Sequence, residues 1–171
     1  MNIYDVIVVG GGHAGCEAAH ASARLGSKTL LITMKIDGIG QMSCNPAIGG
    51  IGKSHLAREV DALDGLICKA ADDASLQSRV LNSSKGAAVR ATRIQTCRDE
   101  YKKAMQKDIL NHENLTVLQS TVKSVKFSKN RAEGVVIETG DYIKSKCVVL
   151  TAGTFLGGVI HMGEKKKRGV G

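Results

Sequence analysis

A glycine-rich motif near the start of the chain has the residue types and spacing of a nucleotide site. Residues 10–15 read Gly-Gly-Gly-His-Ala-Gly, which satisfies G-x-G-x-x-G. A side chain at Gly10 would block a tight turn, and one at Gly12 would hold a pyrophosphate away from the backbone. Gly15 lets the following helix lie close to the preceding strand, so the free N–H groups of the helix N-terminus face phosphate. The residues predicted to bind a dinucleotide are Gly10, Gly11, Gly12, His13, Ala14 and Gly15.

The flanks of the motif support this interpretation, because the motif joins a strand to a helix. Ile3–Val9 is β-branched and nearly continuously apolar, as a strand buried on both faces should be. Ala14, Ala18, Ala21 and Leu25 then recur at helical spacing, and Lys28–Thr33 reads as the next strand. The alternative is a glycine-rich turn that serves packing alone. The second strand ends in Thr-Met-Lys (33–35) instead of the acid that usually holds a ribose, which leaves the adenosine end open.

A second candidate for chemistry is Cys44, which lies in the glycine-rich segment 40–53. Residues 47–54 fit the pattern of a phosphate-binding P-loop, but that motif must follow a buried strand and no strand pattern precedes it. The segment could also be a purely structural loop. The third interpretation is a loop that wraps a cofactor and presents Cys44 to a substrate, with Lys53 and the amides around 49–52 favouring its thiolate.

Two amphipathic helices are predicted in the middle of the chain. The apolar face of the first is formed by Leu56, Val60, Leu63 and Ile67, with Ser54 as its N-cap. The apolar face of the second, which should end near Asn111, is formed by Ile94, Cys97, Tyr101, Met105 and Ile109. Residues 72–91 between these faces are polar and carry a weaker helical signal.

The remainder of the chain predicts a return to strands. Leu115–Gln119 should be a third parallel strand, and Thr121–Phe127 with Ala132–Glu138 should form a hairpin. Tyr142–Lys144 reads as a third short antiparallel strand, and the continuous apolar run Cys147–Thr151 should return to the buried sheet. The fold class is therefore α/β and Rossmann-like, with a helical insertion and a three-stranded antiparallel meander.

Composition and charge narrow the classes of protein. The 171 residues fit one domain with an insertion, and with 43% hydrophobic but only 3% aromatic residues the core must rest on aliphatic side chains. No basic leader and no apolar run of membrane-spanning length is seen, so we expect a cytoplasmic protein without membrane contact. The five cysteines form no C-x-x-C pair, which argues against zinc and disulfides. Four of them are predicted to be inert buried thiols: Cys16, Cys68, Cys97 and Cys147.

The net charge of +8 is unevenly distributed. One window contains no acid and five bases, which are Arg79, Lys85, Arg90, Arg93 and Arg98. Such a window could attract a polyanion, although an ordinary solvated face is the simpler interpretation. Lys165-Lys166-Lys167-Arg168 is interpreted as a solvated basic tail.

The order of elements resembles the FAD domain of glutathione-reductase-like flavoproteins, in which the turn after the last strand closes over the cofactor. The resemblance favours FAD over free NAD. It implies an incomplete FAD-binding domain over residues 1–163, with an insertion at about 35–91 and a β-meander at about 121–144. Residues 164–171 would be the basic tail.

Five segments together resemble a single family: residues 10–19, 40–53, 59–63, 81–93 and 150–156. The family is that of the tRNA uridine 5-carboxymethylaminomethyl modification enzymes, also called glucose-inhibited division protein A (GidA or MnmG). The likeness extends over nearly all of residues 3–163, and the segment around Cys44 is its most specific part. Family members run to several hundred residues, so we expect this chain to correspond to their N-terminal part.

The resemblance implies FAD as cofactor, NADH as reductant, and a partner GTPase of the TrmE (MnmE) type. Together these install a carboxymethylaminomethyl-type group on C5 of the wobble uridine of certain tRNAs, with a folate-derived carbon carried through the flavin. By motif match, Gly10–Gly15 would hold the FAD pyrophosphate, and the backbone of Val122 would contact the adenine side. Cys44 would attack C6 of the uracil ring, and the basic window would face tRNA phosphates. The family commonly forms homodimers.

The length of the chain favours a limited role. The NADH-binding insertion, the later FAD segment and the C-terminal helical domain of family members cannot fit into 171 residues. We therefore expect the polypeptide alone to be incomplete for catalysis. Two alternatives stay open, a non-catalytic flavin-binding module and an FAD-dependent oxidoreductase that acts on a small metabolite.

Overall fold

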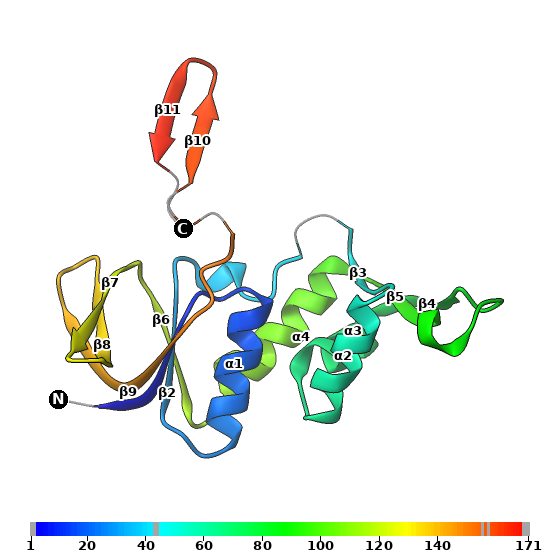
Figure 1. Cartoon of the computed structure of the whole chain (residues 1–171), viewed down its shortest axis with the longest axis horizontal. Coiled ribbons are helices and arrows are strands. Elements are labelled where there is room, and N and C mark those ends of the chain that lie inside the picture. Colours follow the sequence, from blue (N-terminus) through cyan, green and yellow to red (C-terminus); the bar gives the residue numbers. More distant parts are fainter. Residues whose placement is uncertain (1–2, 43–44, 155, 157, 169–171) are drawn as a thin grey trace.

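The computed structural model describes residues 3–42, 45–154, 156 and 158–168. A six-stranded sheet and a three-stranded sheet lie at opposite ends of its long axis, with helices between them (Figure 1). The elements in chain order are β1 Tyr4–Val9, α1 His13–Arg24, β2 Thr29–Thr33, η1 Ile36–Gly38, β3 Ala47–Gly49, α2 Lys53–Ala62, α3 Leu66–Asp73, β4 Ser75–Leu81, η2 Ala87–Val89, β5 Ala91–Thr96, α4 Arg98–Asn111, β6 Leu115–Gln119, β7 Val122–Ser128, β8 Arg131–Ile137, β9 Tyr142–Leu150, β10 Val159–Met162 and β11 Lys165–Arg168.

The large sheet has the strand order β6-β2-β1-β9-β8-β7. β1 lies parallel to both β2 and β9, and β6 extends the parallel part beside β2. All five residues of β2 are buried, which explains the apolar run Leu30–Ile32 at its centre. The predicted third parallel strand, Leu115–Gln119, is confirmed. These parallel strands place the carboxyl ends of β1, β2 and β9 at one edge of the sheet.

Alternate residues of the parallel strands enter two separate cores. Val8 and Leu31 pack with the helices α1, α3 and α4 on one face. Ile7 and Leu30 pack with the meander strand β8, through Val135, on the other face. The buried face of α1 consists of Gly15, Cys16, Ala19 and Ala23. The sequence predicted that Ala14, Ala18, Ala21 and Leu25 would form the buried face of this helix. The observed buried face differs because Gly15 and Cys16 are among the small residues that pack against the sheet.

The predicted strands 142–144 and 147–151 are a single strand, β9. Its first part pairs antiparallel with β8, as Tyr142 does with Val136. Its second part pairs parallel with β1 from Ser145 to Leu150. The polar residues Ser145 and Lys146 suggested a gap, but the extended backbone continues through them because each half has its own neighbouring strand. The meander and the parallel strands are therefore parts of one sheet.

The prediction of the first amphipathic helix is wrong in three respects. It is divided into α2 and α3, and the turn between them holds Asp64 at a φ of 68°. Gly65 follows, where a Cβ would clash with Val60. The side chains of Leu56, Val60 and Leu63 are exposed, so they do not form a buried face. Ser54 lies inside α2, whose N-cap is Gly52.

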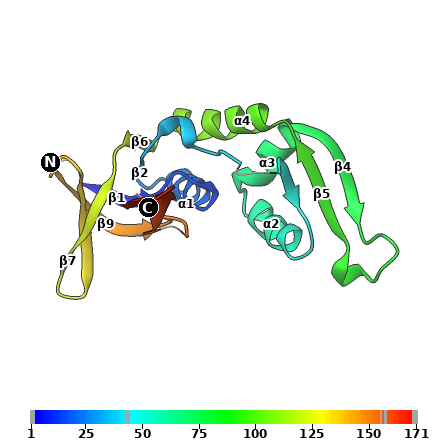
Figure 2. The same cartoon turned by 90° about the horizontal axis from the view of Figure 1, so that it is seen from above.

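The polar segment between the two predicted helices folds as strands. β4 and β5 form an antiparallel hairpin, and β3 pairs with the other side of β5 (Figure 2). Ile94 belongs to β5, so the second helix starts only at Arg98, although it ends at Asn111 as predicted. Its buried residues Tyr101, Met105 and Ile109 are those of the predicted face.

Two further features concern the end of the described chain. Lys165–Arg168, interpreted as a solvated tail, forms strand β11 and pairs antiparallel with β10. Among the helices that the structure describes, none combines the length and the apolar character needed to cross a membrane.

Candidate functional site

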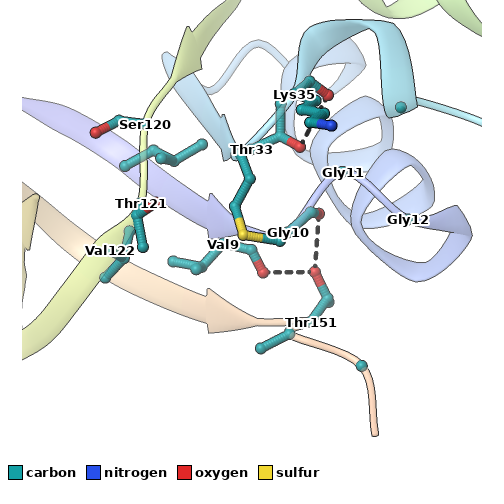
Figure 3. A pocket seen from close by; sticks show the side chains of 15 residues that line it. Val9, Gly10, Gly11, Gly12, Thr33, Lys35, Ser120, Thr121, Val122 and Thr151 are labelled. Carbon is teal, nitrogen blue, oxygen red and sulfur yellow. Dashed lines mark hydrogen bonds between the residues drawn. The ribbon is translucent and has the colours of Figure 1, made fainter. Parts of the chain in front are cut away.

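A cavity of about 440 Å³ lies at the carboxyl ends of β1, β2 and β9 (Figure 3). This is the edge of a parallel sheet where nucleotide ligands generally bind. Its lining residues are Val9, Gly10, Gly11, Gly12, Ile32, Thr33, Met34, Lys35, Gly38, Ser120, Thr121, Val122, Thr151, Ala152 and Gly153. Backbone and small side chains dominate this set, so a large ligand can approach the main chain closely.

The turn after β1 requires glycine at two positions for packing. Gly10 has a φ of 109°, and a Cβ there would clash with the carbonyl oxygen of Thr151. A Cβ on Gly15 would clash with the carbonyl oxygen of Gly10. The two glycines thus bring the first turn of α1 into backbone contact with the end of β1, as the motif predicts.

Gly12 differs from these two glycines because no atom of the residues that the structure describes lies within 4 Å of the position that its Cβ would take. It is the N-cap of α1, and its φ of −72° suits any residue. Packing within the fold therefore gives no reason for glycine here. Open space beside a helix N-terminus is the arrangement that lets a phosphate reach the backbone amides.

The N-terminus of α1 is also electrostatically suited to an anion. Within the described part of the chain no side chain caps it, and its first turn contains no acidic residue. Glu17, in the second turn, accepts hydrogen bonds from the backbone N–H groups of Leu66 (2.9 Å) and Ile67 (2.7 Å). Its carboxylate therefore serves the N-terminus of α3 and leaves the N-terminus of α1 to another anion.

The opposite wall of the cavity is held by Thr151. Its hydroxyl donates to the carbonyl oxygens of Val9 (2.8 Å) and Gly10 (3.1 Å), and its backbone N–H donates to Val9 (2.9 Å). These bonds fix the start of the small-residue turn Ala152–Gly153 against the glycine motif. The sequence suggested such a closing turn, and the hydroxyl explains why threonine precedes it.

The side of the cavity next to β2 is lined by hydroxyl groups and a lysine, and none of its described lining residues is an acid. The Thr33 hydroxyl and the Lys35 side chain lie near Gly11 (Figure 3), and Ser120 and Thr121 lie across from them on the chain that leads into β7. A Cβ on Gly11 would lie 2.7 Å from the Thr33 hydroxyl oxygen. Hydroxyl groups and one ammonium group are thus available to a ribose or phosphate here.

His13 contributes its backbone to the site and directs its side chain elsewhere. The imidazole ring packs against Tyr101, with 5.7 Å between the ring centroids. Burial lowers the pKa of His13, and the nearby charge of Lys53 lowers it further, against an opposing effect of Glu17. A neutral imidazole at this place adds no charge to an anion site, so only the N–H of His13 could contact a phosphate.

Of the four cysteines predicted to be buried, only Cys16 is fully buried. Cys16 is buried, and burial raises its pKa to about 11, as expected for an inert thiol. Cys68 and Cys97 are only partly buried, and Cys147 is exposed on β9, so the prediction that all four are buried is wrong. Cys147 shares a face of β9 with Val149, which packs against the core, but the side chain of Cys147 itself is exposed. Cys44 lies outside the described residues.

The cavity collects some of the predicted binding residues and adds others. Gly10, Gly11, Gly12 and Val122 line it, whereas His13, Ala14 and Gly15 form the adjoining first turn of α1. Ser120, Thr121 and Lys35 were not predicted as binding residues. The position of Ser120 and Thr121 directly after the parallel strand β6 was the available signal, because carboxyl ends of parallel strands converge.

Comparison with known proteins connects this site to one family and one fold. Residues 5–170 match the family model described as "Glucose inhibited division protein A". The structure of Aquifex aeolicus GidA in its form II crystal is 48% identical, with a TM-score of 0.90, and the match covers 96% of this chain and 27% of that chain. In the form I crystal the identity is 47% and the TM-score 0.92, with 99% and 28% covered. The chain thus spans little more than a quarter of these relatives.

A more distant likeness concerns the fold alone. The GidA-related protein from Thermus thermophilus is 19% identical, with a TM-score of 0.64 over 97% of this chain and 60% of that chain. The predicted fold class, a Rossmann-like α/β domain of the FAD-binding type with an antiparallel meander, is confirmed. The insertion, which was predicted to be helical, contains the three-stranded sheet β3-β5-β4 beside its helices.

Proposed function

Because the chain belongs to the family of glucose-inhibited division protein A, we propose that the cavity beside Gly10–Gly12 binds the adenosine diphosphate part of FAD. The observation that carries this proposal is the open space at Gly12 next to the uncapped N-terminus of α1. A pyrophosphate placed there would accept hydrogen bonds from the amides of residues 11–15 and meet the positive end of the helix. The backbone of Gly10–Gly15 is assigned to the pyrophosphate.

The rest of the dinucleotide would follow the walls of the cavity. Thr33 and Lys35 would hydrogen-bond the ribose in place of the usual carboxylate, and the backbone of Val122 would border the adenine. Thr151 would keep the Ala152–Gly153 turn at the distance that the cofactor needs. Bound FAD would supply the redox chemistry of the reaction, while these residues bind it, orient it and exclude water.

We further propose that this chain acts as part of an enzyme that modifies C5 of the wobble uridine of tRNA. Since the chain spans 27–28% of the GidA chains it matches, the activity would need segments beyond those described here. NADH as reductant, a TrmE-type (MnmE) GTPase as partner and a homodimeric assembly belong to the same proposal. The carboxymethylaminomethyl-type product is the specific outcome proposed.

Cys44 is proposed as the nucleophile of this reaction. A thiolate that adds to C6 of uracil forms a carbon–sulfur bond and moves the ring electrons to C5, which becomes an enolate-like nucleophile. C5 can then take up an electrophilic one-carbon unit, and loss of the C5 proton with release of the thiolate restores the ring. A cysteine is suited to this role because it is both a good nucleophile and a good leaving group.

Binding of FAD is tested by titrating the purified chain with FAD, ADP and riboflavin. A site that reads the pyrophosphate should bind FAD and ADP, and it should bind riboflavin at least tenfold more weakly. Equal affinity for riboflavin and FAD would contradict the proposal. If the flavin-loaded chain oxidises NADH rapidly with a small metabolite as acceptor, the oxidoreductase alternative is favoured instead.

The role of Cys44 is tested in a longer family protein that contains this segment. The variant Cys44→Ser should keep its flavin absorbance and lose wobble-uridine modification, because serine cannot provide a thiolate. Cys147→Ser, which removes an exposed thiol on β9, is the matched control and should keep both properties. Unchanged modification in the Cys44→Ser protein would remove Cys44 from the mechanism.

A further inference from the structure

Helix α2 packs on the three-stranded sheet through polar side chains. Ser54 donates to the carbonyl oxygen of Thr92 on β5, and Arg58 donates to the hydroxyl of the same threonine at 3.0 Å. The residues of α2 that line a small cavity beside Thr92 are Ser54, Ala57, Arg58 and Asp61. Their i, i+3, i+4 and i+7 spacing puts them on one side of the helix. The side of α2 that the sheet covers is therefore mainly polar.

The opposite side of α2 is apolar and open to solvent. Leu56, Val60 and Leu63, called the α2 stripe below, have the i, i+4, i+7 spacing of one helical stripe. These residues are 65%, 36% and 71% exposed. A single exposed leucine is common on protein surfaces. Three apolar residues in line are typical of a helix that packs against a neighbour, yet no element in the described part of the chain covers them.

The C-terminal end of the α2 stripe is held in place by the neighbouring helices. Arg24 of α1 donates to the carbonyl oxygen of Leu63 and pairs with Asp64 at 3.4 Å. Lys69 of α3 pairs with the same aspartate. A surface that is fixed before binding loses little conformational entropy when a partner docks. The α2 stripe is thus prepared for packing, although it is exposed.

We propose that the α2 stripe docks an apolar face from the part of GidA-type chains that lies outside the matched region. The chain covers only 27–28% of the Aquifex GidA chains, so most of such a chain is available to cover the stripe. The occupant is an apolar helix or strand long enough to contact two turns of α2. This docking follows from the family membership alone, and neither the FAD site nor the tRNA reaction proposed above enters it.

The size of the α2 stripe favours an intramolecular partner over a second copy of the chain. A stable interface between two proteins buries about 800 Å² on each partner, supplied by about 20–30 residues. Three apolar side chains supply only the centre of such an interface. A segment of the same polypeptide needs a smaller contact, because the covalent link gives it a high effective concentration and lowers the entropy lost on association.

The charge of α2 argues against nucleic acid and membrane as occupants of the stripe. Lys53 and Arg58 are balanced by Glu59 and Asp61, so the helix has no net charge when its histidine is neutral. A polyanion or an anionic membrane surface attracts a basic helix instead. An apolar centre with a charge-balanced polar rim is the composition of a protein interface.

The accessibility of one stripe position tests the proposal. A thiol is introduced by Leu56→Cys in the 171-residue chain and by the same change at the aligned position of full-length Aquifex aeolicus GidA. Maleimide labelling at this position is followed by mass spectrometry of the peptide that contains it. The thiol should react freely in the chain and at least about tenfold more slowly in GidA, because a docked segment blocks the reagent until the contact opens.

Two further variants keep the test interpretable. Asn130→Cys, in the exposed turn between β7 and β8, is the control and should react alike in both proteins. Leu63→Cys repeats the measurement at the other end of the stripe and stays informative if Leu56→Cys does not fold. Equal labelling of the stripe positions in the chain and in GidA would overturn the proposal, as would equal protection of the Asn130→Cys control.

Protein concentration separates the proposed occupant from a second copy. Labelling of the chain and protection in GidA should both stay the same on dilution, because an intramolecular contact does not depend on concentration. Labelling of either protein that becomes faster on dilution would assign the α2 stripe to a second copy and would also overturn the proposal.

Discussion

A Cβ atom on Gly15 would overlap the carbonyl oxygen of Gly10, so the first turn of α1 and the end of β1 are in direct backbone contact. The neighbouring Gly12 has open space around the same position. Packing therefore requires glycine at position 15, whereas the role proposed for Gly12 is to leave room for a phosphate. This difference can be measured.

Gly15→Ala should destabilise the fold. The added methyl group meets backbone, which cannot turn aside as a flexible side chain does, so α1 must move away from β1. Overpacking of this kind costs about 1–3 kcal/mol. Urea unfolding measures the loss, with Gly86→Ala as control, because Gly86 is an open position with a φ of −59°. Equal stability of the two variants would show that α1 is not fixed by this contact.

Gly12→Ala should leave stability nearly unchanged and weaken FAD binding. The methyl group meets no atom of the fold but occupies the space proposed for the pyrophosphate. Loss of one charge-assisted hydrogen bond corresponds to about a tenfold weaker Kd. Fluorescence titration with FAD gives the affinity, and the Gly86→Ala protein should bind as wild type does. Full FAD affinity in Gly12→Ala would place the phosphates elsewhere.

Glu17→Ala should loosen α3 without affecting the cavity. The carboxylate caps the N-terminus of α3 through the N–H groups of Leu66 and Ile67, and removing such a cap costs about 1–2 kcal/mol. Hydrogen exchange should therefore accelerate at the amides of Leu66 and Ile67. Glu59→Ala, at an exposed site on α2, is the control. If exchange at these two amides stays slow in Glu17→Ala, the cap contributes nothing to α3.

The stability of the fold should decrease as pH falls below about 6.5, partly because of His13. Burial lowers the pKa of His13 in the folded chain below its ordinary value of 6.5, so the unfolded chain takes up the proton first. The stabilisation from the neutral ring is present above pH 6.5 and is lost as pH falls through the folded pKa. His13→Phe keeps the ring contact with Tyr101 and removes the titration, so its stability should depend less on pH.

Unfolding by urea at pH 7.5 and 5.5 tests this prediction. The difference between the two pH values should be smaller in His13→Phe than in wild type. His161→Gln, a change at an exposed histidine on β10, should keep the wild-type difference. An undiminished pH dependence in His13→Phe would assign the effect to other groups, among them His20, whose pKa is also lowered by burial.

The half of the fold that contains the glycine motif was predictable because its signals are local. Val6–Val9 and Leu30–Ile32 contribute alternate side chains to the cores on the two faces of the sheet, so both short runs are apolar throughout. The turn between strand and helix needs glycine at fixed positions. From the sequence, Thr33 could be interpreted only as a weaker substitute for the acid that usually holds a ribose, and Lys35 had no assigned role. Their place beside Gly11 depends on the pairing of β1 with β2, which no local pattern contains.

The insertion was harder to predict, for a different physical reason. Six of the seven residues of β4 are exposed, so the strand has no alternation of buried and exposed side chains to signal it. Leu56, Val60 and Leu63 do have helical spacing, yet all three are exposed. The spacing of apolar residues correctly predicts helix α2. Whether another element covers the apolar face of α2 depends on tertiary structure, which the spacing does not contain. The turn at Asp64 and Gly65 then ends the helix earlier than predicted.

The continuity of β9 has a consequence for how the chain folds. β1 can gain its second neighbour only when β9 arrives, and the Thr151 hydroxyl that closes on Val9 is 142 residues away in sequence. Closing so long a loop is slow, because the entropy of the chain is lost before the stabilising contacts form. The glycine turn and α1 can form from local interactions, and we expect the pocket wall opposite them to form later, because it needs contacts distant in sequence. Flavin should therefore bind only after this final docking step, and it should slow the escape of β9 once bound.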